Sequence, residues 1–440
     1  MAAGQALDVT LPAPGGPPPP ITGDAATGDA ALAVLLACLH QDALLLRGEL
    51  LTTLDEDGWQ RLLSLAAAHS VRGLVNQRLT DSSVVSLVPA NVQRDLRDAA
   101  RQTAARMLRA QTQIAELVSG FDTASIPVIA LKGVHLARAV YPNQTLRAMQ
   151  DIDLLVPRED LQSATDIALG LGYTPIRPFT VDQEAAAKSH IARLTRPESL
   201  DVEIHWNITA PNVPYSIDPA DLWARTVPVD VGRCQLLGLS PEQLLLHLCA
   251  HASYQHGFEF GIRSLVDVAA TLRRFDAELD WELVVRQCRA WRWQRGVGVS
   301  LSLARELFGA DVPGDALDSF AADTGGAATD TEVINAARVQ ILGEPSLYAE
   351  SHHFARLRTT PGFWPKAGQT WGRIFLPRSE MSRLHGKNLG LGRLAMLYVV
   401  RSCTLIGRYA RSAIGLLEGG TAPLGPAERR QQLRRWLSEG

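Results

Sequence analysis

The sequence has few cysteines and no surplus of charge of either sign. Its five cysteines are scattered over 440 residues without a CxxC pair, which argues against a disulfide framework or a cysteine zinc site and favours a reducing cytoplasm. Forty-three Lys and Arg residues nearly balance 46 Asp and Glu residues, whereas a protein that coats nucleic acid needs a concentrated positive field. The near-balance therefore disfavours long DNA or RNA as a partner.

Segments that would direct the chain to a membrane or to secretion are also missing. Residues 1–10 lack the basic stretch and apolar run of a signal peptide. The most apolar long segment, residues 394–417, is interrupted by Arg401, Arg408 and Arg411, and a spanning helix needs about 20 predominantly apolar residues. We therefore expect a soluble, cytoplasmic protein without a membrane span.

Several motifs of common enzyme classes are absent too. There is no G-x-S-x-G, no recognisable catalytic cysteine signature and no P-loop, which disfavours serine or cysteine nucleophiles and P-loop phosphoryl transfer. Gly296 and Gly298 lack the third glycine of a dinucleotide-binding turn, so we interpret them as sites of close helix packing.

The period of the apolar residues divides the chain into five parts. Residues 1–27, rich in Pro, Gly and Ala, are expected to form a flexible tail, and residues 28–120 have helical spacing. Residues 121–232 contain convincing strand signals, residues 233–322 return to helical spacing, and residues 323–440 are basic and partly helical. The pattern predicts an α+β fold in which a mixed core is flanked by N- and C-terminal helical regions.

Individual elements follow from the same patterns. Helices are expected over residues 31–50, 58–79, 92–121, 158–173, 240–257, 262–275, 280–291 and 294–309. Strands are expected over residues 126–131, 151–156, 190–194 and 200–206, the last two as an antiparallel pair. Ser240 and Pro241 are typical of a helix start.

The predicted strand 151–156 contains an Asp-x-Asp pair. Side chains at i and i+2 of a strand face the same side, so Asp151 and Asp153 project together while Ile152 and Leu154 face the core. Two adjacent carboxylates repel each other unless a cation neutralises them, and hard oxygen ligands suit Mg²⁺. A solvated strand end is the alternative interpretation.

A second strand offers further carboxylates. Strict alternation over residues 200–206 places Asp201, Glu203 and His205 on one face and apolar side chains on the other. If this strand lies beside strand 151–156, Glu203 or Asp201 completes a carboxylate cluster for two metal ions. The alternative is an exposed polar face on an edge strand.

Positive charge and a turn precede the Asp-x-Asp pair. The apolar run 126–131 ends at Lys132-Gly133 and opens into a helix-like segment, an arrangement that presents backbone N–H groups to a phosphate. Lys132 and Arg147 would add positive charge against a triphosphate.

The helical region after the core has its own polar groups. His247 and His251 are spaced i, i+4, with His256 nearby; this spacing suits zinc, but packing or substrate contact is the favoured interpretation because the glutamate of a zinc protease motif is absent. Arg263 and Asp267 have the spacing of an ion pair on one helix face.

Taken together, these residues resemble a bacterial family of uncharacterised nucleotidyltransferases within the DNA-polymerase-β-like nucleotidyltransferase superfamily. The resemblance is carried by Leu131-Lys132-Gly133, Tyr141-Pro142, Arg147, Asp151–Val156, Gly172-Tyr173 and Glu203–Trp206. It extends over roughly residues 30–310 and is most specific between residues 129 and 207. The usual superfamily turn is Gly followed by Gly or Ser, whereas Val134 follows Gly133 here.

The resemblance implies a small mixed sheet with helices on one face, and binding of an NTP with two Mg²⁺ ions, or Mn²⁺ in their place. The implied catalytic and metal-binding residues are Asp151, Asp153 and Glu203. The residues expected to bind the nucleotide are Lys132, Gly133 at the phosphate-facing turn, Arg147 and His205.

The implied reaction is transfer of a nucleoside monophosphate from an NTP to a hydroxyl of an unidentified small-molecule, peptide or protein acceptor. Family members often accompany biosynthetic or peptide-tailoring genes. One alternative is phosphoryl or pyrophosphoryl transfer from the same site, and another is a nucleotide-binding scaffold without catalysis. From the sequence, Asp153→Asn should abolish activity and leave the melting temperature unchanged or raised, because it relieves repulsion.

Overall fold

The computed structural model describes residues 29–80, 83–232, 234–326, 330–343, 396–398 and 426–438. Residues 1–344 and 433–440 form one compact unit and residues 345–432 another. The fold and site below lie in the first unit, apart from residues 426–432, which begin the last helix. The predicted tail 1–27 and most of the predicted region 323–440 fall outside the described residues. No helix in the described part of the chain combines the length and apolar character needed to cross a membrane.

The N-terminal region is helical. Its helices are α1 (Ala30–Leu39), α2 (Gly48–Leu51), α3 (Glu56–Ala68), α4 (Arg72–Thr80) and α5 (Ala90–Thr123). The predicted helix 58–79 is divided between α3 and α4 because Ser70 has a left-handed backbone with a φ of 57°, which a continuing right-handed helix does not accommodate.

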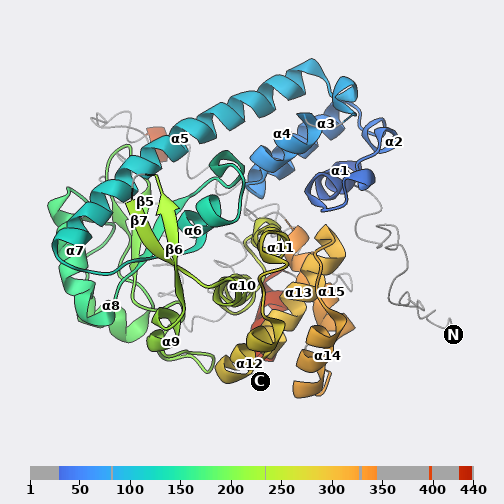
Figure 1. Ribbon diagram of the computed structural model, residues 1–440. Coiled ribbons are helices and arrows are strands. Elements are labelled where there is room, and N and C mark those ends of the chain that lie inside the picture. The colour runs from blue at the N-terminus through green and yellow to red at the C-terminus, as the bar shows by residue number, and fades with distance from the viewer. Residues whose placement is uncertain are drawn as a thin grey trace. The chain divides into compact units, whose positions relative to one another are not determined.

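A seven-stranded mixed sheet follows (Figure 1). Its strands are β1 (Ile129–Ala130), β2 (Asp151–Leu155), β3 (Thr174–Pro175), β4 (Leu194–Thr195), β5 (Asp201–His205), β6 (Thr226–Val231) and β7 (Cys234–Leu239). Their order is β3-β4-β5-β2-β1-β7-β6. The pairs β2–β5 and β1–β7 are parallel and the other pairs are antiparallel. The predicted α+β class and the predicted antiparallel pairing of β4 with β5 are confirmed.

One face of the sheet is covered by α5 and α7 (Leu161–Gly170). Ile152 and Leu154 of β2 and Val202 and Ile204 of β5 are fully buried in a core cluster with apolar side chains of these two helices. The alternation predicted for both strands is therefore confirmed, and the odd-numbered side chains of β2 and β5 point to the opposite face.

That opposite face is packed by α6 (Lys132–Ala139) and by the helices after the sheet. Leu155, at the end of β2, lies in a second core cluster with Leu136 of α6 and Leu244 of α10. The remaining helices are α8 (Val181–Ala187), α9 (Pro219–Trp223), α10 (Pro241–Ala250), the π-helical segment η5 (His251–Gln255), α11 (Arg263–Phe275), α12 (Trp281–Trp291), α13 (Gln294–Phe308), α14 (Gly314–Asp323), α15 (Thr331–Leu342) and α20 (Pro426–Ser438).

Two local predictions for these helices are confirmed. The Ser240 side chain accepts a hydrogen bond from the backbone N–H of Gln243 and caps α10, with Pro241 in its first turn. A methyl group on Gly296 of α13 would overlap the ring of Tyr254, so this glycine permits close helix packing. The sheet ends at Leu239, beyond residue 232, and the division of the chain into five domains stays a prediction.

Candidate active site

The parallel pairing of β2 with β5 brings the predicted carboxylates together. In its register Asp151 lies opposite Asp201, and Asp153 lies opposite Glu203. All four side chains are on the sheet face that is not covered by α5 and α7. The expectation that the two acidic strands are neighbours is therefore confirmed.

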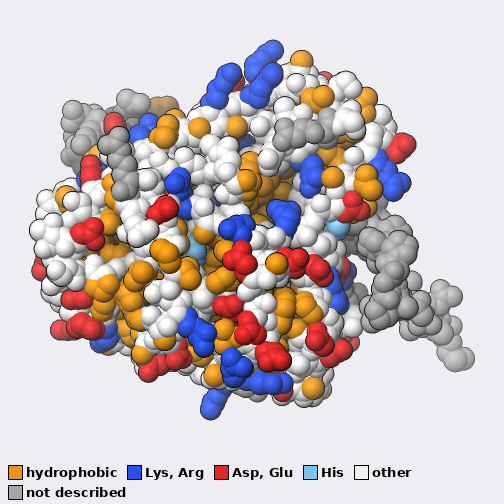
Figure 2. All heavy atoms as spheres, in the orientation of Figure 1, with side chains coloured by type: hydrophobic (Ala, Val, Ile, Leu, Met, Phe, Trp, Pro, Cys, Tyr) orange, Lys and Arg blue, Asp and Glu red, His pale blue; other side chains and the backbone are white. Residues whose placement is uncertain are grey.

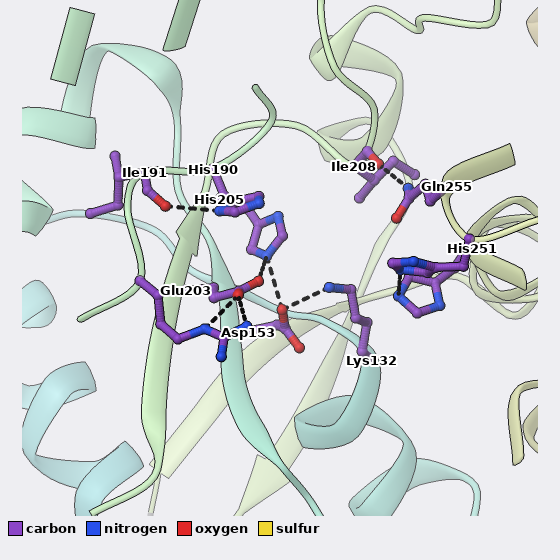
Figure 3. Close-up of polar contacts among 11 residues, drawn as sticks. Lys132, Asp153, His190, Ile191, Glu203, His205, Ile208, His251 and Gln255 are labelled. Atoms are coloured by element: carbon purple, nitrogen blue, oxygen red, sulfur yellow. Dashed lines mark hydrogen bonds and ion pairs between the residues drawn. The ribbon is translucent and has the colours of Figure 1, made fainter. Parts of the chain in front are cut away.

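Asp153 is the most enclosed carboxylate of the cluster, with 1% of its surface exposed. Its Oδ1 accepts hydrogen bonds from Lys132 Nζ at 2.8 Å and from His205 Nε2 at 2.9 Å (Figure 3). Two charge-assisted hydrogen bonds on one buried oxygen compensate for the loss of water around it. The structure thus joins Lys132, Asp153 and His205 in one group.

Glu203 contacts Arg193 and His205. It is 8% exposed, its Oε1 accepts from Arg193 Nε at 3.1 Å, and its Oε2 lies 3.7 Å from His205 Nε2. Arg193 also lies 3.7 Å from the Asp201 carboxylate. The sequence patterns did not indicate Arg193 as a site residue. The predicted antiparallel pair 190–194 and 200–206 would have placed it near Glu203 once the register was known.

The positive groups hold two carboxylates in their charged form. Burial by itself would raise the pKa of Asp153, but Lys132 and His205 outweigh it and the pKa lies well below the usual range. Burial by itself would also raise the pKa of Glu203, but the hydrogen bond and charge of His205 lower it to about 2. Both groups are thus carboxylates at neutral pH.

The pKa values of Asp151 and His205 are raised, whereas those of Asp153 and Glu203 are lowered. Burial and the charge of Asp153 raise the pKa of Asp151, with Lys132 only partly opposing them. Burial and Lys132 act to lower the pKa of His205, but its hydrogen bonds to Asp153 and Glu203 leave that pKa raised. The site therefore concentrates negative charge and favours an additional cation beside Asp151.

Lys132 stands at the first position of α6, directly after β1. Its backbone is left-handed, with a φ of 40°, which is unusual for a residue with a side chain and is found where a site constrains the chain. The tight backbone turn thus lies at Lys132 itself, while Gly133 already belongs to α6. A side chain on Gly133 would come within 2.9 Å of Met149 Cγ, so this glycine permits close packing in the first turn.

Arg147 lies in a separate buried group. It is 7% exposed, and its Nε lies 2.8 and 2.9 Å from the two carboxylate oxygens of Asp267. The Tyr141 hydroxyl donates to the same carboxylate at 2.8 Å. The sequence prediction paired Asp267 with Arg263, but the partner is Arg147 from the segment before β2, and Arg263 Nη1 donates to the carbonyl of Ala148 at 3.3 Å.

The three histidines singled out in the sequence, His247, His251 and His256, lie in or directly after α10 and η5. Both ring nitrogens of His247 are buried without a hydrogen-bond partner, and burial lowers the pKa of His247 to about 3. His251 Nε2 lies 3.2 Å from His256 Nε2. These histidines are absent from the cluster of potential metal-binding side chains found in the described part of the chain, and their role in packing or substrate contact stays a prediction.

That cluster consists of Asp153, Glu203 and His205, whose potential ligand atoms all lie within 4.8 Å of one another. Two of its three members are predicted metal-binding residues, and the third, His205, was expected beside the nucleotide. Carboxylate oxygens at this separation fit a hard divalent cation. Asp151 lies outside the cluster but on the same strand face, and its role as a ligand stays a prediction.

One comparison with known proteins identifies the family of this chain. A search of curated proteins and a search of solved structures found no match. The model of one family, described as an uncharacterised nucleotidyltransferase, matches residues 55–309. This match spans more than half of the chain and contains the sheet, Lys132 and the acidic cluster. The chain therefore belongs to the uncharacterised nucleotidyltransferase family.

Proposed function

We propose that this protein is a Mg²⁺-dependent nucleotidyltransferase that moves a nucleoside monophosphate from an NTP to an acceptor hydroxyl. The observation that carries the proposal is the pairing of Asp153 with Glu203 across two parallel strands, with Asp151 on the same face. Such a set of acidic side chains on one sheet face is suited to holding cations against the phosphates of a nucleotide. Family membership supports the same class of reaction.

The chemistry of the donor set fits magnesium. Asp151, Asp153 and Glu203 would hold two Mg²⁺ ions, or Mn²⁺ in their place. Bound ions of this kind neutralise phosphate charge and lower the pKa of an attacking hydroxyl. His205 would position the Asp153 and Glu203 carboxylates through Nε2, which lies between them.

Lys132 is the side chain best placed to bind the triphosphate. Its ammonium already lies against the acidic cluster, 2.8 Å from Asp153, and it stands at the N-terminal end of α6, where backbone N–H groups favour anions. A cation on the Asp153 oxygen would compete with this ion pair and leave the ammonium to a phosphate. The Arg147 guanidinium already binds Asp267 and the carbonyl of Ala148, so Lys132 ranks before it.

In the proposed reaction the acceptor oxygen attacks the α-phosphorus of the NTP. The new bond joins the acceptor oxygen to the α-phosphorus, the bond from the α-phosphorus to the bridging oxygen breaks, and pyrophosphate leaves with that oxygen. The hydroxyl proton passes to solvent. Most of the acceleration would come from in-line positioning and neutralisation of charge.

The acceptor is a small molecule, a peptide or a protein in this proposal. Figure 2 shows Lys and Arg side chains interspersed with Asp and Glu on the face in view. A mixture of this kind gives no electrostatic footprint for long nucleic acid on that face.

The decisive experiment asks whether the α- or the γ-phosphate of the NTP is transferred to the acceptor. The full-length protein is incubated with Mg²⁺, cell extract and each NTP carrying ³²P at either the α- or the γ-phosphate. Nucleotidyl transfer labels an acceptor from the α-label alone and releases labelled pyrophosphate from the γ-label. Mass spectrometry of the product should show a retained base.

Two other outcomes identify the alternative functions. Transfer of the γ-label into the acceptor, without the base, would show phosphoryl or pyrophosphoryl transfer and contradict the proposal. Magnesium-dependent NTP binding without labelling of any acceptor in extracts and candidate panels would favour a nucleotide-binding scaffold. Labelling that persists in Asp153→Asn would place the reaction outside this site.

A further inference from the structure

An aromatic group lies directly after α10, on a part of the chain that the proposed chemistry does not use. We call His251, His256 and Phe260 the aromatic wall. The ring centroids of His251 and His256 are 4.4 Å apart, and those of His256 and Phe260 are 3.9 Å apart. Both ring pairs meet edge to face, at interplanar angles of 70° and 72°. Phe260, the last ring of the group, is 54% exposed.

The backbone holds the aromatic wall in an unusual shape. Its first residue begins the π-helical segment η5, and such interruptions of α-helices are frequent at functional sites. The chain then passes through two consecutive left-handed residues, Gly257 with φ 54° and Phe258 with φ 62°. Phe258 is buried and anchors the turn, which leaves Phe260 facing outward.

One end of the aromatic wall, His251, lies close to Lys132, which contacts the acidic cluster. In Figure 3 the Lys132 side chain lies between Asp153 and His251, with its ammonium against the carboxylate. The charge of Lys132 contributes, after burial and His256, to a pKa of His251 well below the usual range. Gln255 of η5 donates a hydrogen bond to the carbonyl of Ile208, just beyond β5, which ties the segment of the wall to the strand that carries Glu203.

The chemistry of the aromatic wall differs from that of the carboxylate face. It offers aromatic rings and, at His251, an imidazole whose pKa lies well below the usual range, whereas the carboxylates and Lys132 are suited to cations and phosphates. A flat heteroaromatic group with polar edges stacks on aromatic rings and forms hydrogen bonds with a neutral imidazole. In an NTP the base has this character and the triphosphate is the charged part.

We propose that the aromatic wall binds the nucleobase of the donor NTP, with Phe260 and His256 as the stacking residues. The inference rests on the proposed nucleotidyltransferase function and adds the base-binding residues to it. A core role does not explain Phe260, since it is exposed.

The test compares a complete NTP with a ligand that lacks the base. Affinities of the full-length protein for ATP, GTP, CTP, UTP and inorganic tripolyphosphate are measured by calorimetry with Mg²⁺. Phe260→Ala should weaken binding of the preferred NTP about tenfold, within the range for one base–aromatic stack, and leave tripolyphosphate affinity unchanged. Phe260→Trp should restore NTP affinity. Leu108→Ala, which removes an exposed apolar side chain from α5, serves as the control and should bind both ligands like the wild type.

Each part of the inference can fail separately. If the wild type prefers an NTP to tripolyphosphate and Phe260→Ala keeps the full preference, the aromatic wall does not bind the base, while the nucleotidyltransferase proposal stands. Equal wild-type affinities for NTP and tripolyphosphate would also refute the base-binding role. If the wild type binds neither with Mg²⁺, both proposals are refuted.

Discussion

Asp153→Asn removes one negative charge from the centre of the acidic cluster and keeps the shape of the side chain. The sequence alone suggests that the loss of repulsion from Asp151 leaves the protein as stable or makes it more stable. The structure predicts the opposite. Asp153 is 1% exposed and accepts hydrogen bonds from both Lys132 and His205, so neutralising it leaves two positive groups in a buried site without their main counter-charge.

The magnitude follows from these two contacts. Hydrogen bonds that involve a charged group are worth about 1.5–3 kcal/mol each. An asparagine oxygen can still accept from Lys132 and His205, but the attraction between opposite charges is lost. Breaking a buried ion pair from one side costs about 3–5 kcal/mol, but Glu203 remains beside His205 and lowers this cost. We therefore expect Asp153→Asn to reduce the free energy of unfolding by about 2–4 kcal/mol and to abolish nucleotide transfer.

Asp151→Asn is the matched control, because it makes the same change two residues away on the same strand face. Burial and Asp153 raise the pKa of Asp151, so its charged form is disfavoured in the folded protein, and its neutralisation should leave stability unchanged or increase it. Urea denaturation at neutral pH without divalent metal, followed by tryptophan fluorescence, measures both variants. The reasoning is refuted if Asp153→Asn is as stable as the wild type, or if the two variants lose equal stability.

Three further variants test other parts of the unit. The pKa of His247 is about 3 in the folded protein against 6.5 for a free histidine, so the unfolded chain binds the proton first as the pH falls. The protein should therefore lose about 2–3 kcal/mol of stability between pH 7 and 4.5. Urea titrations at the two pH values should show a correspondingly smaller loss for His247→Leu, and an unchanged pH dependence would contradict this. Gly296→Ala should lower the free energy of unfolding by about 1–3 kcal/mol through overpacking, whereas Gly170→Ala, which has open space around it, should not; equal stabilities would contradict the close packing. Asp267→Asn should cost about 3–5 kcal/mol because it leaves the Arg147 guanidinium buried without its partner, and replacing both residues by apolar ones should cost less; a single variant as stable as the wild type would show that the pair is not buried in solution.

Much of the local structure could be predicted from the sequence. The alternation over residues 151–156 and 200–206 determines which side chains of β2 and β5 enter the core, because a strand turns successive side chains to opposite faces. Helical spacing, together with caps such as Ser240, similarly places most helices after the sheet. The same residues carry the family resemblance that the comparison with family models confirms.

The periodicity of a strand fixes which face a side chain occupies, but it does not fix its neighbours. Only the tertiary structure decides that β5 lies parallel to β2 in the register that sets Glu203 opposite Asp153. It likewise decides that Arg147 contacts Asp267, 120 residues away, and that Lys132 has a left-handed backbone at the start of α6. Contacts between distant parts of the chain depend on how whole elements pack, and that packing turns separate acidic strands into one site.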